Sequence, residues 1–100
     1  MNNYSVADIK QALSKVMHPE INYSLVDLGM IEDIVHKEYK ADLTLKLPFP
    51  GIPIKEVLIQ SIHGALADVD ETMQVEITIK QMSQEEREKF MRMAKEKWKL

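Results

Sequence analysis

The chain of 100 residues contains no cysteine, and only 6% of it is aromatic. Without cysteine no disulfide can form, and this chain alone cannot build a zinc or iron–sulfur site with thiolate ligands. No apolar run approaches the roughly 18–20 residues that a membrane-spanning helix needs. The first residues also lack the basic start and apolar block of a secretory signal. We therefore expect a cytoplasmic protein that does not enter a membrane.

A strong charge of one sign is missing as well. The chain carries 13 basic and 16 acidic residues, for a net charge of −3. The basic residues near its end alternate with glutamates, which is typical of a solvated helix face. Nucleic-acid binding calls for a denser basic patch with aromatic platforms. We therefore expect no nucleic-acid partner.

Apolar residues make up 45% of the chain, and their spacing predicts one domain over residues 1–100. Helical spacing predicts helices over residues 5–17, 53–67 and 83–97, and alternation predicts strands over residues 30–36, 41–47 and 73–79. Ser5 is a plausible N-cap, and Ser83 with Glu86 forms a capping box. The order α-β-β-α-β-α predicts an α+β fold of two layers, in which helices cover one face of a small three-stranded mixed sheet. The first two strands should form a hairpin, whereas the pattern leaves the strand order open.

Few residues of this sequence could act in catalysis or bind a metal ion. The chain has no cysteine nucleophile, no glycine-rich phosphate loop and no Gly-x-Ser-x-Gly elbow, so we expect no enzyme. His36 and His63 are best interpreted as exposed histidines. His18-Pro19-Glu20 places an imidazole and a carboxylate around a stiff turn, and such a pair could join a metal site or carry a proton. A structural or surface role is the favoured interpretation of His18, with metal ligation as the alternative.

The segment Pro48-Phe49-Pro50-Gly51-Ile52-Pro53 joins a strand to a helix and holds three of the four prolines. Pro50 and Pro53 remove two backbone donors, and Gly51 allows a close approach. Phe49 and Ile52 place apolar side chains on this stiff frame, which suits a partner's peptide or side chain better than a phosphate. The alternative is a rigid turn whose Phe49 and Ile52 pack into the core.

The order of the segments "VMHPEI", "SLVDLGMIEDIVH", "ADLTLKLPFPGIP" and "VEITI" resembles the small iron–sulfur cluster assembly domain. That family includes SufT- and PaaD-like proteins and the N-terminal extension of Mrp-type ATPases. The resemblance runs from the first helix to about Phe90. Its most specific parts are Pro19-Glu20, Val26-x-Leu28-Gly29 and Pro50-Gly51-x-Pro53.

This sequence departs from the family at the residues that matter most for chemistry. The family carries Asp-Pro-Glu where this chain has His18-Pro19-Glu20, and it commonly carries Thr-x-Pro-Gly-Cys-Pro at the loop. The threonine of that motif falls at Pro48 and the cysteine at Ile52, and isoleucine cannot ligate iron. A Pro-x-Trp element after the last strand is also absent. The resemblance thus implies a retained framework without the thiol.

The resemblance implies an accessory or adaptor protein of iron–sulfur cluster assembly or metalloprotein maturation, with no cofactor of its own. Its expected partners are iron–sulfur assembly factors or client metalloproteins. The residues expected to bind them are Glu20, Asp27, Phe49, Pro50, Gly51, Ile52 and Pro53.

Two other hypotheses remain open at this point. In one, a divalent-metal-binding variant uses His18 and Glu20, with Asp27 or His36 as a further ligand. In the other, the protein is a structural module that self-associates as a homodimer through Phe90, Met93 and Trp98.

Overall fold

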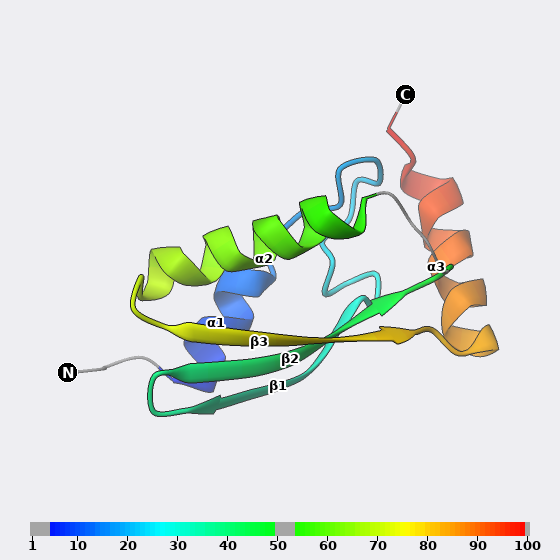
Figure 1. Cartoon of the computed structure of the whole chain (residues 1–100). Coiled ribbons are helices and arrows are strands. Elements are labelled where there is room, and N and C mark those ends of the chain that lie inside the picture. The colour runs from blue at the N-terminus through cyan, green and yellow to red at the C-terminus, as the bar shows by residue number, and fades with distance from the viewer. Residues whose placement is uncertain (1–4, 50–53, 100) are drawn as a thin grey trace.

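The computed structural model describes residues 5–49 and 54–99, which form three helices and three strands (Figure 1). In chain order these are α1 (Val6–Leu13), β1 (Ile31–Lys37), β2 (Lys40–Leu47), α2 (Lys55–Val69), β3 (Gln74–Gln81) and α3 (Gln84–Lys97). This order confirms the predicted α-β-β-α-β-α arrangement and the α+β fold class.

The sheet has the strand order β1-β2-β3. β1 and β2 form the predicted antiparallel hairpin, and β3 pairs with β2 in parallel, so the sheet is mixed. The parallel pairing requires a crossover connection, which α2 supplies. In Figure 1, α2 lies over one face of the sheet, and α3 lies beyond the end at which β2 and β3 finish.

The core fills the space between the sheet and the helices α1 and α2. β2 contributes alternate residues to it, with Ala41, Leu43, Leu45 and Leu47 buried. These side chains share one face because successive residues of a strand point to opposite sides. The buried residues of the two helices are Ile9, Leu13, Leu58, Ile62 and Leu66.

The first helix is shorter than the pattern predicts, because α1 ends at Leu13 rather than near residue 17. Beyond it the chain doubles back on itself. The Leu25 N–H donates to the Val16 carbonyl at 2.9 Å, and the His18 N–H donates to the Tyr23 carbonyl at 3.0 Å. A backbone that pairs with the segment ahead of it cannot continue as a helix, so the apolar Val16 is buried from a loop.

The other boundaries differ by a few residues. α2 begins at Lys55 with Ile54 as its N-cap, and Pro53 lies outside the described residues. β3 continues to Gln81 because it stays in register with β2 up to Leu47. No helix in the described part of the chain is long and apolar enough to cross a bilayer.

Candidate functional site

The segment that follows α1 is fastened to the C-terminal end of α3. The Asn22 N–H donates to the Lys97 carbonyl at 2.7 Å, and the Lys99 N–H donates to the Glu20 carbonyl at 2.9 Å. Between them, Ile21 and Trp98 form a β-bridge. These backbone bonds hold the turn at residues 18–22 beside the last turn of the helix.

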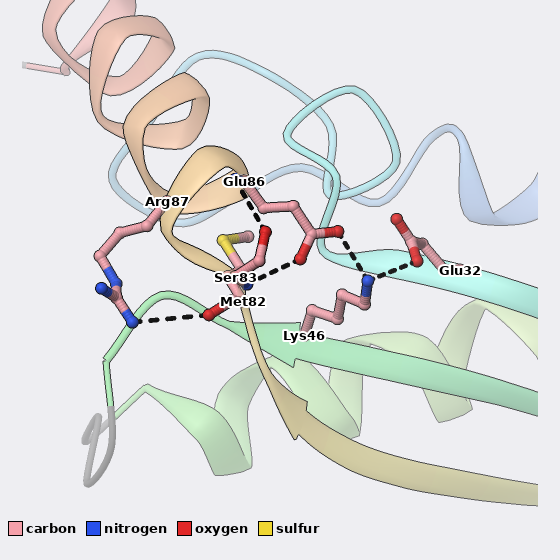
Figure 2. Close-up of polar contacts among 6 residues, drawn as sticks. All are labelled: Glu32, Lys46, Met82, Ser83, Glu86 and Arg87. Atoms are coloured by element: carbon pink, nitrogen blue, oxygen red, sulfur yellow. Dashed lines mark hydrogen bonds and ion pairs between the residues drawn. The ribbon is translucent and has the colours of Figure 1, made fainter.

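The start of the proline-rich loop is fastened to the other end of α3 by Arg87. The Arg87 Nε–H donates to the Pro48 carbonyl at 2.6 Å, and the guanidinium carbon lies 5.7 Å from the centroid of the Phe49 ring. A second guanidinium nitrogen donates to the Met82 carbonyl at 3.5 Å (Figure 2). One side chain therefore fixes both the direction of the chain at Pro48 and the position of Phe49.

The first turn of α3 is attached to the sheet by charge. Ser83 and Glu86 form the predicted capping box, and Lys46 Nζ lies 2.6 Å from the Glu86 carboxylate and 2.7 Å from that of Glu32 (Figure 2). The hydrogen bond from Lys46, together with the Ser83 N–H, lowers the pKa of Glu86 to about 2. Glu32 and Glu86 in turn raise the pKa of Lys46 above its ordinary value. The three charges tie α3 to β1 and β2 at neutral pH.

An open cavity of about 440 Å³ lies between the turn at residues 18–22 and the start of the proline-rich loop at Pro48 and Phe49. We call it the α3 groove. Most of its lining is apolar, with Glu20 and Lys95 as the two charged side chains. The lining residues are His18, Glu20, Ile21, Met30, Pro48, Phe49, Ile54, Phe90, Met91, Ala94, Lys95 and Trp98. Phe49 and Trp98 are both exposed and contribute aromatic surface to it. Such a groove suits an apolar side chain or segment of another molecule.

His18 is the polar group buried in the wall of this groove, with 3% of its surface exposed. Its Nδ1 accepts a hydrogen bond from the Glu20 N–H at 2.9 Å, and its ring centroid lies 6.3 Å from that of Phe90. Burial lowers the pKa of His18, and the neighbouring charge of Lys99 also lowers it while Glu20 raises it. The hydrogen bond that Nδ1 accepts requires a neutral imidazole with its proton on Nε2, which has no hydrogen-bond partner among the described residues.

The contact within His18-Pro19-Glu20 differs from the one that the sequence suggested. The imidazole meets the backbone N–H of Glu20, whereas the Glu20 side chain is exposed. Across residues 5–49 and 54–99, no group of three or more His, Asp or Glu side chains is placed to hold a metal ion.

The structure brings some of the predicted site residues together and separates others. Glu20 and Phe49 both line the α3 groove. Asp27 does not line it, and its backbone N–H donates to Ser24 Oγ at 3.0 Å in the turn before β1. His36 lies near the β1–β2 hairpin, at the opposite end of the sheet from α3 (Figure 1), where a ring nitrogen lies 2.7 Å from the Glu38 carbonyl. Pro50, Gly51, Ile52 and Pro53 lie outside the described residues, so their role stays a prediction.

Sequence reasoning missed Arg87, and it expected Phe90 and Trp98 at a subunit interface. Arg87 is 39 residues from Pro48 in the chain, and no local pattern signals their contact. Phe90, expected at a subunit interface, is only 6% exposed and belongs to the core, because its helix packs against the His18 turn. Trp98, assigned to the same interface, is 49% exposed and lines the α3 groove, so its place at a subunit interface stays a prediction.

Comparison with known proteins identifies similar sequences and a similar fold. The family model for "Iron-sulfur cluster assembly protein" matches residues 6–79. The Fe-S protein maturation auxiliary factor YitW of Bacillus subtilis is 29% identical over 89 residues, which cover 88% of this chain and 87% of that protein. The iron-sulfur cluster carrier protein of Mycobacterium tuberculosis is 32% identical over 82 residues, which cover 81% of this chain but only 22% of the carrier.

A crystal structure of a domain of unknown function, DUF59, from Bacillus anthracis superposes with a TM-score of 0.70 and 22% identity. The match covers 89% of this chain and 86% of that one. At this identity the likeness establishes the shared fold.

Proposed function

Because this chain belongs to the iron–sulfur cluster assembly protein family, we propose that it is an accessory protein of iron–sulfur cluster assembly that recognises other proteins. In this proposal, another protein binds in the α3 groove and against the adjoining proline-rich loop, residues 48–53. The partner is an iron–sulfur assembly factor or a client metalloprotein, and the encounter takes place in the cytoplasm. The names of the relatives, a maturation auxiliary factor and a cluster carrier, support this class of partner.

The observation that carries the proposal is the α3 groove itself. Its walls are held in place before any partner arrives, by backbone bonds at residues 20–22 and by Arg87 at Pro48. A surface that is already ordered avoids part of the entropic cost of binding. Aromatic residues are enriched at the cores of protein interfaces, and the groove offers two exposed ones, Phe49 and Trp98.

The absence of cysteine limits what the protein contributes to assembly. The chain has no thiolate to offer to a cluster, and Ile52 stands where the family commonly has its cysteine. In this proposal, a cluster held by thiolates would be cargo bound to the partner. We infer that this chain acts by recognition, as a non-enzymatic adaptor, rather than by holding the cluster through thiolates.

Affinity capture from native lysate under anaerobic conditions tests the proposal. Wild type is compared with Phe49→Asp and with a matched control, Tyr39→Asp. Phe49 is 45% exposed in the groove, and Tyr39 is 51% exposed at the β1–β2 hairpin. A buried carboxylate in the groove would have to lose its hydration, so recovery of the partner should fall at least about tenfold with Phe49→Asp. Tyr39→Asp should recover the same proteins as wild type.

Two outcomes contradict the proposal. If Phe49→Asp recovers the same assembly factors or iron–sulfur proteins as wild type, the groove is not the binding site. If wild type recovers neither assembly factors nor iron–sulfur proteins, the adaptor role is wrong.

The metal-binding hypothesis makes a separate prediction. It requires stoichiometric binding of a divalent ion that His18→Ala eliminates, which native mass spectrometry would detect. The buried, hydrogen-bonded Nδ1 of His18 gives no reason to prefer it.

A further inference from the structure

β3 forms one edge of the sheet, and no strand of the described chain lies on its outer side. All eight of its residues, Gln74–Gln81, are exposed or half-buried, and all eight are in regular register with β2. The opposite edge, β1, is interrupted by a register shift between Glu32 and Val35, with Asp33 at a φ of 53°. Bulges of this kind protect an edge from further pairing. β3 has no such interruption and can accept another strand.

The free backbone groups of β3 belong to its odd-numbered residues. The Gln74 N–H donates to the Tyr39 carbonyl, and the Met82 N–H donates to the Leu47 carbonyl. Backbone groups of alternate residues point to opposite sides of a strand, so the even-numbered residues face β2. Val75, Ile77 and Ile79 therefore direct their N–H and C=O groups to the open edge.

The sequence of β3 is complementary to itself when it is reversed. Glu76-Ile77-Thr78-Ile79-Lys80 has a polar centre, an isoleucine on each side of it, and opposite charges at its two ends. In an antiparallel pair centred on Thr78, Glu76 of one copy lies opposite Lys80 of the other, and Ile77 lies opposite Ile79. Centring the pair on Glu76 or on Lys80 would instead place like charges opposite each other, which is unfavourable.

This register also fits the direction of the free backbone groups. Ile77 and Ile79 carry outward-facing groups, so they form the hydrogen-bonded pairs of the new ladder. Glu76 and Lys80 then form the non-hydrogen-bonded pairs, whose side chains approach each other most closely. The outward-facing backbone groups thus allow the register that places Glu76 opposite Lys80. Centring the pair on Ile77 or Ile79 is allowed by the same groups, but it leaves Glu76 and Lys80 without each other as partners.

The charged residues beside β3 include no carboxylate that forms an ion pair with Lys80 in the described part of the chain. Lys80 lies in register beside Lys46, whose ammonium is already bound by Glu32 and Glu86. Among the described residues Lys80 has no ion-pair partner. Glu76 is held from the β2 side by Lys40 at 2.8 Å, which leaves its outer side toward the open edge. A second copy would bring Glu76 to Lys80 on both sides of the pair.

On the face of the sheet opposite to Glu76 and Lys80, the side chains of Ile77 and Ile79 are only partly covered. Ile77 is half-buried and Ile79 is 42% exposed, although their neighbours in register, Leu43 and Leu45, are buried. Pairing two copies would place Ile77 and Ile79 of each strand side by side. Such apolar cross-strand pairs stabilise an antiparallel ladder.

We propose that the β3 edge is a self-association surface, on which two copies of this chain pair antiparallel about Thr78 and join their sheets. Binding of a partner in the α3 groove uses other residues, so this inference stands or falls independently of the proposed function.

Sedimentation velocity of the full chain over a concentration series tests the proposal, with K80E, E76K and an equimolar mixture of the two variants. Wild type should form a reversible dimer. In either variant alone, both cross-strand charge pairs become like-charged, so the dissociation constant should rise at least about tenfold. In the mixture, both pairs are again of opposite charge, and the dimer should return. K89E, which changes an exposed charge on α3, should behave as wild type.

Three results would overturn the proposal. Wild type could remain monomeric at every concentration, the dimer could be insensitive to K80E and E76K, or the mixture could fail to associate although each variant folds. Circular dichroism of each variant separates loss of pairing from loss of fold. A dimer that only Trp98→Ser weakens would point to α3 as the contact surface.

Discussion

At the scale of single residues, Arg87 joins the first turn of α3 to Pro48 and Phe49, which line the α3 groove. Its guanidinium donates to the Pro48 carbonyl at 2.6 Å and lies over the ring of Phe49. A planar group with several donors can hold a carbonyl and cover an aromatic ring at the same time. An ammonium is a single point of charge and cannot do both.

Arg87→Lys should therefore lower the free energy of unfolding by about 1 kcal/mol, through the weakened charged hydrogen bond and ring contact. It should also reduce partner capture through the groove, because Phe49 loses its support. Urea denaturation and affinity capture measure the two effects. Arg92→Lys is the matched control, since Arg92 is exposed on the same helix. Equal stability and equal capture for both variants would show that Arg87 does not hold the loop.

His18 shows what local sequence reveals about a residue and what it does not. The motif His18-Pro19-Glu20 indicated an imidazole and a carboxylate around a stiff turn, but the contact that forms joins His18 Nδ1 to the backbone N–H of Glu20 rather than to its side chain. The burial of the ring depends on Phe90 and on the backbone bonds to the end of α3. Those partners come from the far end of the chain, so no local pattern could indicate them.

At the scale of elements, the attachment of α3 to the sheet depends on the charge of Glu86. Its carboxylate binds Lys46 and the Ser83 N–H, which lowers its pKa from an ordinary value of 4.5 to about 2. A carboxylate whose pKa is lower in the folded protein stabilises the fold above the unfolded value, and this contribution is lost as the pH falls toward the folded value. The window for this loss is from about pH 4.5 down to about pH 2.

As the pH falls from about 4.5 to about 2, the free energy of unfolding should decrease more for wild type than for Glu86→Gln, because the variant lacks the titrating carboxyl group. At pH 7 the order should be reversed, with Glu86→Gln less stable because the ion pair with Lys46 is absent. Chemical denaturation at a series of pH values measures both. Glu85→Gln removes an exposed carboxylate from the same first turn and serves as the control. Parallel pH profiles for wild type and Glu86→Gln would contradict the assigned role.

The start of α1 was easier to predict than its end. Ser5 and Ser83 each accept a hydrogen bond from a backbone N–H in the first turn, and these caps are local features that a sequence displays. α1 ends at Leu13 because residue 16 bonds to residue 25, and residue 18 to residue 23, across a loop. That pairing competes with the helix, and the apolar spacing of Val16 gave no sign of it.

At the scale of the whole molecule, the alternating strands and amphipathic helices were sufficient to predict the order of elements and the mixed sheet. The strand order was not predictable, because the same faces can be buried in more than one arrangement. The α3 groove was not predictable either. It is assembled from residues 18–21, from Pro48, Phe49 and Ile54, and from α3, which meet only after the chain has folded. Of the predicted binding residues that the structure describes, Glu20 and Phe49 line the groove, and Asp27 does not.

The most direct test of the central claim is site-specific photocrosslinking of the full chain in native lysate. A photoreactive phenylalanine analogue replaces Phe49, Trp98 or the control residue Tyr39, and crosslinked proteins are identified by mass spectrometry. We predict that Phe49 and Trp98 crosslink to the same iron–sulfur assembly factor or client protein, because both line the α3 groove. Tyr39 should not crosslink to that protein. A partner that crosslinks at Tyr39, and at neither groove position, would contradict the account.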